Sequence, residues 1–595
     1  MRRPEFTRSP TAALALVVVL SACGSSSVAP DAGADRSSDL GADAPAERAD
    51  DAAPEGSPDV SPDGAAAPST VTLGLSPPPV DCRPYAGLAA CVLHVSTTPA
   101  APDADGLSWA TAFSSVQPAL DRAPCGCVVW IAAGTYLPTM VIDPAAVPPD
   151  PRDLSFVLWP GAQILGGFAG TEASADARAA GHETILSGDL GVAGDSEDNA
   201  YHVVVGAAGA ELDGLTVRGG EANGFMLAQA VGGGLLALDA SMTLRNLVIS
   251  DNDADGSGGG AFFDEASDAH VVGCTFARNT SNDGGGLVVL GDSAVVERSL
   301  FEDGVGVFSG PAITQFASTL TVTDSRFLRN HGDSGGAVTA SGGDATFERC
   351  WFESNVATSF GGAMLVRFGA SVHVASSVFV SNASVGFGGA LAVWTSSLEV
   401  ASSTIVDDVA ALGGAFLVKD GAQFGLADSV VWRSLDDAGR VFDLDGAPSA
   451  LDVRTSDLPL EVPAVLSFDA DPKLGNAPLT TRFAEQAGGV DHLPVAGADQ
   501  AFAVGDRIEL GVDGVERHVT AVSADDVSFA PALAAAVPRF LRIDKWSPTA
   551  PSLTLDLTPQ PGSPLIDGAS PVAPALDVDG HPRVRAPDIG AIEGP

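Results

Sequence analysis

The stretch CWFESNVATSFGGAMLV at residues 350–366 has close copies on both sides of it in the chain. CTFARNTSNDGGGLVVL occupies residues 274–290, and SVFVSNASVGFGGALAV occupies residues 377–393. Each copy carries a phenylalanine, an asparagine three positions later, and a glycine pair followed by a small or apolar residue. A pattern that returns at a fixed interval indicates a repeat protein.

Three columns of equivalent positions recur along the chain, and the glycine column sets the interval, which is 25 to 27 residues. The glycine column, with Pro311 as a degenerate copy, runs Gly234, Gly260, Gly286, Pro311, Gly336, Gly362, Gly389 and Gly414. The apolar column runs Val217, Ile249, Phe276, Phe301, Phe327, Phe352, Phe379, Ile405 and Val431. Three positions after it stand Asn252, Asn279, Gly304, Asn330, Asn355, Asn382 and Asp408.

Short alternating segments lie between these columns, such as LTVTDSRF at residues 320–327 and LEVASSTI at residues 398–405. Their alternation and their β-branched residues favour strands, and no segment of the repeats has a helical period. We therefore predict an all-β solenoid, a parallel β-helix with three short strands in each rung. Rungs of such a solenoid stack about 4.8 Å apart, so equivalent residues form columns along it.

The columns predict specific packing. We expect the phenylalanines to stack inside the solenoid, where the burial of each contributes roughly 1.5–3 kcal/mol. The asparagines should occupy a left-handed bend and hydrogen-bond to neighbouring rungs. The glycines should supply positive φ at a tight turn. Cys274 and Cys350, three rungs apart, should be small buried residues that cannot reach each other. A surface ion ladder is expected at Asp251, Arg278, Asp303 and Arg329.

The first residues of the chain have features of export. A basic segment, residues 2–8, precedes the apolar run TAALALVVVL, which is too short to span a membrane permanently. LSAC follows at residues 20–23 and resembles the lipobox of bacterial lipoproteins. That resemblance implies a signal peptide over residues 1–22 and a lipidated Cys23 that anchors the protein in a membrane. Gly24 and Ser25 resemble the sorting pattern for the outer membrane, and an ordinary secretory signal is the alternative.

Composition separates a tether from a folded body. The 595 residues carry 75 acidic and 30 basic side chains, and the net charge of −45 disfavours nucleic acid as a partner. Residues 23–78 are mostly Ala, Asp, Pro, Ser and Gly, so we expect a disordered acidic tether there. Most of the acidity remains on the folded body, as in a solvated envelope protein or one that holds cations.

Four cysteines cluster near the start of the folded part, at Cys82, Cys91, Cys125 and Cys127. Cysteines spaced like Cys125 and Cys127 rarely reach the geometry of a mutual disulfide, so we expect them to pair back to Cys82 and Cys91. A zinc site is the alternative, although the C-x-C spacing is not the usual one for its ligands.

Two further elements frame the repeats. In SWATAFSSVQPALDRA, residues 108–123, the apolar residues lie on one helical face, which predicts a short helix capping the N-terminal end of the solenoid. The residues on that face are Trp109, Ala112, Phe113, Val116 and Leu120. Residues 486–547 alternate like strands but lack the repeat interval, which predicts a small inserted β-module.

Several motifs resemble known families. GGAV, GGAM, GGAL and GGAF, with FARN, FLRN, FESN and FVSN, resemble the repeats of the polymorphic outer-membrane proteins, which are surface adhesins. Residues 103–123, 163–172 (QILGGFAGTE) and 561–593 (PGSPLIDG through DIGAIE) resemble bacterial β-helix proteins with a choice-of-anchor Q domain, in the pectate-lyase-like superfamily. The resemblance implies a right-handed parallel β-helix over residues 79–485 and a C-terminal segment over residues 548–595.

Candidate chemistry is sparse. DNDADG at residues 251–256 places Asp251, Asp253 and Asp255 at the spacing of the first half of a calcium loop. Phe262 stands where such a loop has its bidentate glutamate, so a solvated turn is the alternative to a Ca²⁺ site. Glycoside hydrolysis needs two carboxylates at a defined separation, and we predict no catalytic residues.

Two functions are left open by the sequence. The first is a non-catalytic, lipid-anchored protein of the outer membrane or cell surface that binds a glycan or another surface partner. The second is a polysaccharide lyase or glycoside hydrolase of the pectate-lyase-like superfamily. Carboxylates and a base that converge in a groove on adjacent rungs would indicate the enzyme.

Overall fold

The computed structural model describes residues 75–593 apart from 86–87, 89–90, 99–103, 143–149, 265–266, 291–292, 437–439, 446–449, 455, 457–473, 477–478, 485–487, 496, 512–513, 535–540, 551, 554–555, 562, 567–568, 570–572 and 584–586. The predicted signal peptide, Cys23 and almost all of the predicted tether therefore lie outside the described residues. Within the described part, no helix is long and apolar enough to cross a membrane.

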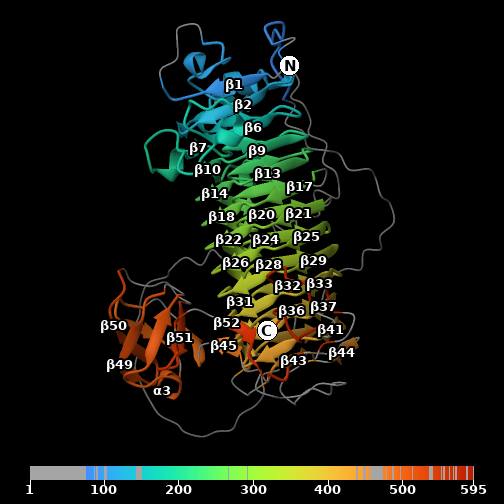
Figure 1. Cartoon of the computed structure of the whole chain (residues 1–595), viewed down its shortest axis with the longest axis vertical. Coiled ribbons are helices and arrows are strands. Elements are labelled where there is room, and N and C mark those ends of the chain that lie inside the picture. The colour runs from blue at the N-terminus through green and yellow to red at the C-terminus, as the bar shows by residue number, and fades with distance from the viewer. Residues whose placement is uncertain are drawn as a thin grey trace, which may run out of the picture. The chain divides into compact units, whose positions relative to one another are not determined.

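A parallel β-helix forms most of the described chain, and its strands belong to four sheets (Figure 1). Sheet 1 has thirteen strands. They are β1 (Val92–Val95), β2 (Val128–Ala132), β6 (Gln163–Phe168), β9 (Ala210–Asp213), β13 (Met242–Arg245), β17 (Ala269–Val272), β21 (Ser293–Glu297), β25 (Thr319–Thr323), β29 (Asp344–Glu348), β33 (Ser371–Ala375), β37 (Ser397–Ala401), β41 (Gln423–Ala427) and β44 (Ala450–Arg454).

Sheet 2 has eleven strands and sheet 3 has eight. Sheet 2 contains β3 (Gly134–Tyr136), β7 (Thr184–Ser187), β10 (Thr216–Arg218), β14 (Val248–Ser250), β18 (Thr275–Ala277), β22 (Leu300–Glu302), β26 (Arg326–Leu328), β30 (Trp351–Glu353), β34 (Val378–Val380), β38 (Thr404–Val406) and β42 (Val430–Trp432). Sheet 3 contains β11 (Glu221–Ala222), β15 (Asp253–Ser257), β19 (Thr280–Asp283), β23 (Val305–Ser309), β27 (His331–Ser334), β31 (Val356–Phe360), β35 (Ala383–Phe387) and β39 (Val409–Leu412).

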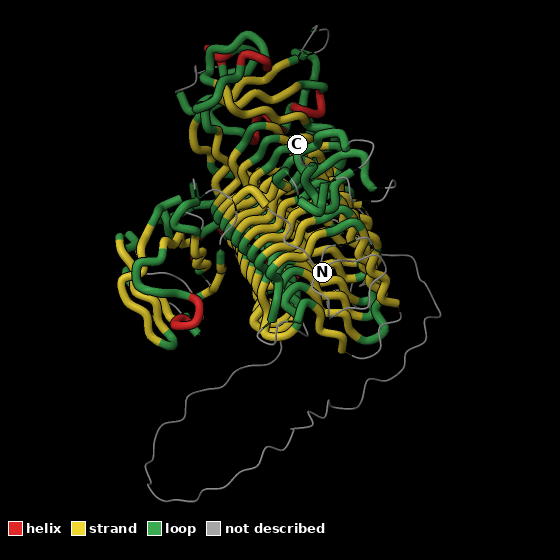
Figure 2. Tube along the Cα trace, turned by 60° about the horizontal axis from the view of Figure 1, so that its bottom comes forward, coloured by secondary structure: helices red, strands yellow, loops and turns green. Residues whose placement is uncertain are grey.

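Sheet 4 has twelve strands. They are β4 (Met140–Val141), β5 (Leu154–Val157), β8 (Val204–Val205), β12 (Leu235–Ala237), β16 (Ala261–Phe263), β20 (Leu287–Leu290), β24 (Ile313–Phe316), β28 (Val338–Ser341), β32 (Met364–Arg367), β36 (Leu391–Trp394), β40 (Phe416–Lys419) and β43 (Phe442–Asp445). A full rung thus has four strands, not the three predicted, because the glycine turn divides what looked like one segment into sheets 3 and 4. Figure 2 shows these strands stacked rung upon rung.

The predicted apolar column is confirmed as the core of sheet 2. Its residues are register partners from rung to rung, and Phe276, Phe301, Phe327, Phe352 and Phe379 are at most 2% exposed. Neighbouring rings stack with centroids 4.5 to 5.3 Å apart. The period of the sequence therefore corresponds to one turn of the solenoid.

The asparagines form the expected ladder, but not in the expected backbone conformation. Nδ2 of Asn355 donates to Oδ1 of Asn382 at 3.0 Å, and Nδ2 of Asn382 donates to Oδ1 of Asp408 at 2.8 Å. The left-handed residue is the one before each asparagine, such as Ser354 with φ 58°. The asparagine side chain is thereby turned inward, where its amide satisfies buried backbone groups of two rungs.

The two glycines of each pair are required for different reasons, the first for its backbone angle and the second for lack of space. The first glycine has positive φ, as in Gly361 with φ 65°. The second, Gly362 of the predicted column, is needed for space, because a Cβ there would overlap the carbonyl oxygen of Gly389 in the next rung. The expectation of positive φ therefore holds for the residue before the column and is wrong for the column itself.

Cys274 and Cys350 are buried and unbridged, as predicted. They belong to a column in which backbone N–H groups donate to a side-chain oxygen or sulfur of the following rung. The amide of Cys274 donates to Oγ of Ser299 at 3.2 Å, and that of Cys350 donates to Oγ of Ser377 at 3.1 Å. Burial raises the pKa of the Cys350 thiol to about 12, so this thiol stays protonated and inert.

The predicted N-terminal cap is present, and its short helix is accompanied by two 3₁₀ turns. These elements are η1 (Trp109–Thr111), α2 (Gln117–Leu120) and η2 (Ala123–Cys125). Phe113 between them is extended and forms a parallel bridge with Val95, so it continues the edge of the solenoid. Phe113, Val116 and Leu120 are still buried against the first rungs, which closes that end.

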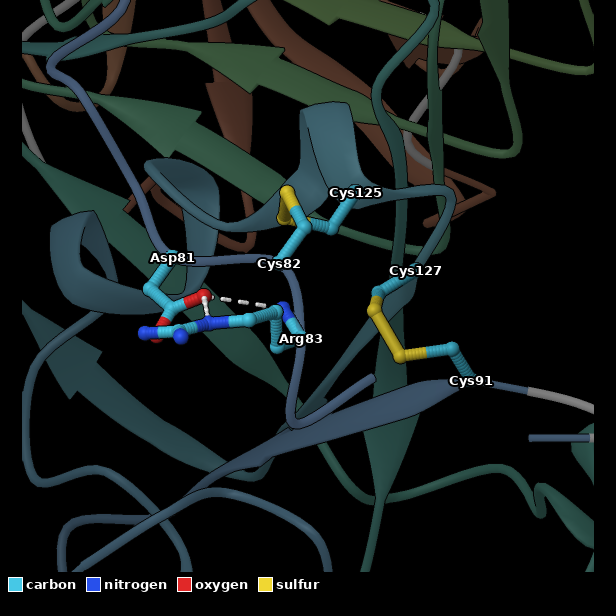
Figure 3. Close-up of a disulfide and its surroundings, with 6 residues drawn as sticks. All are labelled: Asp81, Cys82, Arg83, Cys91, Cys125 and Cys127. Carbon is cyan, nitrogen blue, oxygen red and sulfur yellow. Dashed lines mark hydrogen bonds and ion pairs between the residues drawn. A yellow bond between two sulfur atoms is a disulfide. The ribbon is translucent and has the colours of Figure 1, made fainter. Parts of the chain in front are cut away.

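Two disulfides fasten this cap (Figure 3). Cys82 is joined to Cys125 with Cα atoms 5.4 Å apart, and Cys91 is joined to Cys127 with Cα atoms 4.5 Å apart. Each bridge links the segment before β2 to the chain around β1. The remaining 3₁₀ turns lie in surface connections, at η3 (Pro151–Asp153), η4 (Ala175–Ala177), η5 (Ser196–Asp198) and η6 (Leu227–Ala230).

The inserted module is a six-stranded antiparallel sheet with its own core. Its strands, in spatial order, are β46 (Thr480–Phe483), β51 (Arg542–Trp546), β48 (Arg507–Leu510), β49 (Arg517–Ser523), β50 (Asp526–Ala530) and β47 (His492–Pro494), with α3 (Ala498–Ala501) beside them. The sheet thus starts at β46, before the predicted boundary at residue 486.

The C-terminal segment covers part of sheet 2. Its strand β52 (Asp556–Pro559) pairs with β45 (Leu474–Asn476). Leu557, Ala591 and Ile592 pack on the outward side chains of Val378, Val380 and Val406. The backbone N–H of Gly590 donates to the carbonyl of Asp428 at 2.9 Å. The lower rungs of sheet 2 are therefore shielded, while Val248 higher up is 40% exposed.

Candidate functional site

The predicted calcium ligands lie where β14 turns into β15, and the turn separates them. Asp251 is the left-handed residue of that turn, with φ 56°. Its carboxylate pairs with Arg278 of the next rung, with Nε to Oδ1 at 2.8 Å. The hydrogen bond from Arg278 lowers the pKa of Asp251 below its usual range. Asp251 is therefore committed to an ion pair and does not face the other two aspartates.

Asp253 and Asp255 do share a face of sheet 3, and a third carboxylate joins them. Glu221 in β11 is the register partner of Asp253 in β15, and Ala222 is the partner of Ala254. Both alanines are buried, at 0% and 2% exposure, so Glu221 and Asp253 point outward together. Partners on neighbouring strands lie about 4.8 Å apart along the solenoid.

Burial, and then the charge of neighbouring carboxylates, raises the pKa values of Glu221 and Asp253. Burial, and then the charge of Asp253, raises the pKa of Glu221 to about 7. Burial, and then the charge of Asp255, raises the pKa of Asp253 to about 6. Near neutral pH the pair therefore carries a proton on one member and a charge on the other. Such a pair can donate and accept protons, or it can exchange its proton for a cation.

Arg152, in η3, holds the backbone beside these carboxylates in place through hydrogen bonds. Its Nε donates to the carbonyl of Asn199 at 2.6 Å and its Nη2 to the carbonyl of Glu221 at 2.7 Å. The guanidinium lies over the ring of Tyr201, 4.2 Å from the centroid. Its charge lowers the pKa of Glu221, opposing burial and the nearby aspartates. Arg152 thus holds the backbone carbonyl of Glu221 in place and partly stabilises the charged form of the Glu221 carboxylate.

A loop with an exposed aromatic side chain follows Glu221. Nδ2 of Asn223 donates to Oε1 of Glu221 at 3.3 Å. Phe225, two residues further, is fully exposed, and Met226 is 51% exposed. We call the group made by Arg152, Glu221, Asn223, Phe225, Asp253 and Asp255 the sheet 3 site. Its carboxylates and amide lie on the outward face of sheet 3, and Phe225 is exposed in the adjoining loop.

Asp283, one rung beyond Asp253, does not join the sheet 3 site. Its side chain is 4% exposed and accepts a hydrogen bond from Oγ of Ser309. Burial raises its pKa above the usual range. Its neighbour Asn282 instead donates to the backbone carbonyl of Asp255.

Among the described residues, the group of three possible ligands close enough to hold one metal ion is Asp577, Asp579 and His581. Oδ1 of Asp577 already accepts the backbone N–H of Asp579 at 3.1 Å and that of His581 at 2.7 Å. This carboxylate therefore orders the turn in DVDGH. The spacing was visible in the sequence, but the predicted Asp251, Asp253 and Asp255 do not form such a group.

A shallow hollow of about 360 Å³ lies between the start of the described chain and the first rungs. It is lined by Leu75, Val157, Trp159, Val205 and Leu238, with Asp239 as its one charged side chain. An apolar hollow at a turn has few groups that could orient a ligand.

Comparisons with known proteins agree with the architecture. Residues 233–405 match the family model described as "Right handed beta helix region". Together with the stacked parallel strands of the four sheets, this match shows that the chain contains a right-handed parallel β-helix. A comparison with curated protein sequences finds no match.

Solved structures with similar folds include the pectate lyase Pel9A, at 13% identity and a TM-score of 0.36, covering 88% of this chain and 99% of that one. The tailspike protein gp49 of Acinetobacter baumannii bacteriophage Fri1, a capsular polysaccharide depolymerase, has 12% identity and a TM-score of 0.30, covering 77% and 86%. A mutant tailspike of E. coli bacteriophage HK620 in complex with a pentasaccharide has 10% identity and a TM-score of 0.21, covering 76% and 94%. These values are too low to transfer a ligand or a residue role.

Proposed function

We propose that this protein is an exported lipoprotein that binds a glycan at the sheet 3 site. One observation carries the proposal: carboxylates and an amide lie together on the outward face of sheet 3, and the loop that follows them carries a fully exposed aromatic ring, Phe225. Carboxylates and amides accept and donate hydrogen bonds to hydroxyl groups, and an aromatic ring packs on the apolar face of a sugar. A rigid β-helix loses little entropy when it binds.

The proposal extends to the protein's relatives, a bound ion and its location in the cell. The GGA and F-x-x-N motifs and the 561–593 segment support kinship with the polymorphic outer-membrane proteins and the choice-of-anchor Q proteins. Calcium is proposed as a bridging ion, held by Asp253 and Asp255 and not by Asp251. Lipidated Cys23 would place the protein at the outer membrane or cell surface.

The anchoring is tested by Cys23→Ser. We expect the variant to leave the membrane fraction almost completely, because the acyl chains supply the affinity for the membrane. Fractionation and mass spectrometry of the N-terminal peptide measure this, with Cys274→Ser as the matched control. A wild-type peptide without acyl groups would refute the anchoring.

Glycan binding is tested with the full chain in detergent on a glycan array, with and without calcium. We expect Asp253→Asn together with Asp255→Asn, and separately Phe225→Ala, to weaken binding roughly tenfold or more. Asp344→Asn, at an exposed position in sheet 1, is the control and should bind normally. Calcium-dependent binding should be tighter at pH 7.5 than at pH 5.5, because Glu221 and Asp253 lose their protons between these values. Unchanged binding in both site variants would contradict the proposal.

A glycoside hydrolase is the second candidate, favoured by the placement of Glu221 and Asp253 on adjacent rungs. Retaining glycosidases hold their two carboxyl groups about 5–5.5 Å apart, comparable to the spacing of rungs. Glu221, with the higher pKa, would be the acid and Asp253 the nucleophile. New reducing ends that disappear in Glu221→Gln would establish this function, whereas unsaturated uronate products would indicate a lyase.

A further inference from the structure

The left-handed turn between sheets 2 and 3 presents a column of side chains that changes along the solenoid. The predicted ion ladder is found in its upper half, where Arg278 pairs with Asp251 at 2.8 Å and Arg329 pairs with Asp303 at 2.9 Å. The ladder is then interrupted by two serines and resumes with an ion pair between Arg433 and Asp407. The complete column is Asp251, Arg278, Asp303, Arg329, Ser354, Ser381, Asp407 and Arg433.

An arginine from the inserted module fills the interruption. Nη1 of Arg542, in β51, donates to Oγ of Ser354 at 2.8 Å and pairs with Oε1 of Glu353 at 3.3 Å. Its Nε pairs with Asp544 of the module at 2.7 Å. The Arg542 side chain is 3% exposed, whereas that of Arg278 in the open part of the column is 57% exposed. The module thus supplies a guanidinium where the column itself has none.

The contact between the two bodies is polar. The buried residues of the module's apolar core cluster lie between residues 484 and 543, and in the described chain no buried apolar cluster joins its six-stranded sheet to the solenoid. The charges around Arg542 include Asp407, whose pKa burial raises to about 6 against the opposing effect of Arg433. Asp544 of the module raises that pKa too. The contact between the module and the solenoid therefore brings the carboxylates of Asp407 and Asp544 close together, along with the guanidinium of Arg542.

We propose that Glu353 and Ser354 form a guanidinium-binding notch in the solenoid and that Arg542 holds the module there as a releasable latch. A fork of N–H donors matches a carboxylate and a hydroxyl placed side by side. Because the module has its own core and the solenoid is stabilised rung by rung, neither body needs the contact in order to fold. Loss of the arginine should therefore separate two folded bodies without unfolding either of them.

The latch is tested by measuring the distance between spin labels in the full chain. Labels at Val385→Cys in β35 and Val504→Cys in the module replace side chains that are 45% and 69% exposed, and the unbridged thiols of the described residues, Cys274 and Cys350, are buried. The parent should give one narrow distance distribution. In Arg542→Met we expect the ratio of the broad to the narrow component to rise at least tenfold.

Two further variants make the test specific. Arg507→Met breaks an ion pair with Glu516 inside the module and should leave the distribution narrow. Glu353→Gln together with Ser354→Ala alters only the solenoid side and should broaden it as Arg542→Met does. Hydrogen exchange in β49 and β50 should stay unchanged in all variants. The latch would be overturned if the distance distribution stayed narrow both in Arg542→Met and in the Glu353→Gln, Ser354→Ala double variant. It would also be overturned if the distribution broadened only in variants whose module had lost its protection from hydrogen exchange.

Discussion

Replacing Phe352 by alanine should lower the free energy of unfolding by about 3–5 kcal/mol. The side chain is completely buried, and its ring stacks between Phe327, with centroids 4.5 Å apart, and Phe379, at 4.6 Å. Phe347 meets it edge to face at 5.9 Å. The rungs above and below are fixed by backbone hydrogen bonds, so they cannot collapse into the space that the ring leaves. Lost burial and the residual cavity therefore add to each other.

Denaturant unfolding of the full chain measures this effect, with Phe225→Ala as the matched control. Phe225 is fully exposed, so its removal should change the unfolding midpoint very little. The loss at Phe352 should extend to neighbouring rungs, because each rung is stabilised mainly by the next. Equal midpoints for Phe352→Ala and the parent would mean that the ring contributes no packing energy.

The repeated columns could be predicted because a solenoid places one residue of each rung directly above its equivalent. Phe352 and Asn355 were therefore assigned to the core and to the ladder from spacing alone. Spacing did not reveal which residue of a turn is left-handed. That residue is Ser354 and not Asn355, because the asparagine amide must point inward to satisfy the backbone of the adjacent rungs.

The candidate site was predicted only in part, for a related reason. Asp253 and Asp255 were identified from their spacing, but Asp251 in the same motif is rotated away by its left-handed backbone and pairs with Arg278. Glu221 was missed because its rung carries a glycine in place of the ladder asparagine and a loop, NGFMLAQA, that breaks the pattern. The register of β11 with β15 brings Glu221 beside Asp253, and register across an insertion is not visible in the sequence.

The largest effect is expected for Gly362→Ala, which should destabilise the protein by more than about 5 kcal/mol or prevent its folding. The backbone of Gly362 is not left-handed, so the cost comes from space and not from φ. A Cβ there would overlap the carbonyl oxygen of Gly389 and lie 2.6 Å from the carbonyl carbon of Ala383. Both contacts are with backbone of the next rung, which cannot rotate away as a side chain can.

The neighbouring hydrogen bonds prevent the rungs from separating locally. The N–H of Gly362 donates to the carbonyl of Gly388 at 2.9 Å, and the N–H of Ala363 donates to that of Ala390 at 2.8 Å. Moving the rungs apart to admit a methyl group would break both bonds and disturb the Phe352–Phe379 stack on the same turns. The substitution therefore acts on the spacing that all four sheets share.

Gly369→Ala is the control that separates the two possible costs of losing a glycine. Gly369 has φ 77°, but a Cβ there would have no atom within 4 Å. Alanine at this position should lower the free energy of unfolding by only about 1–2 kcal/mol, the cost of a left-handed backbone for a residue with a Cβ. Soluble yield and denaturant unfolding should therefore rank Gly369→Ala well above Gly362→Ala. If the two variants were equally stable, the second glycine of each pair would serve the backbone angle after all, and the close approach of the rungs would not be what requires it.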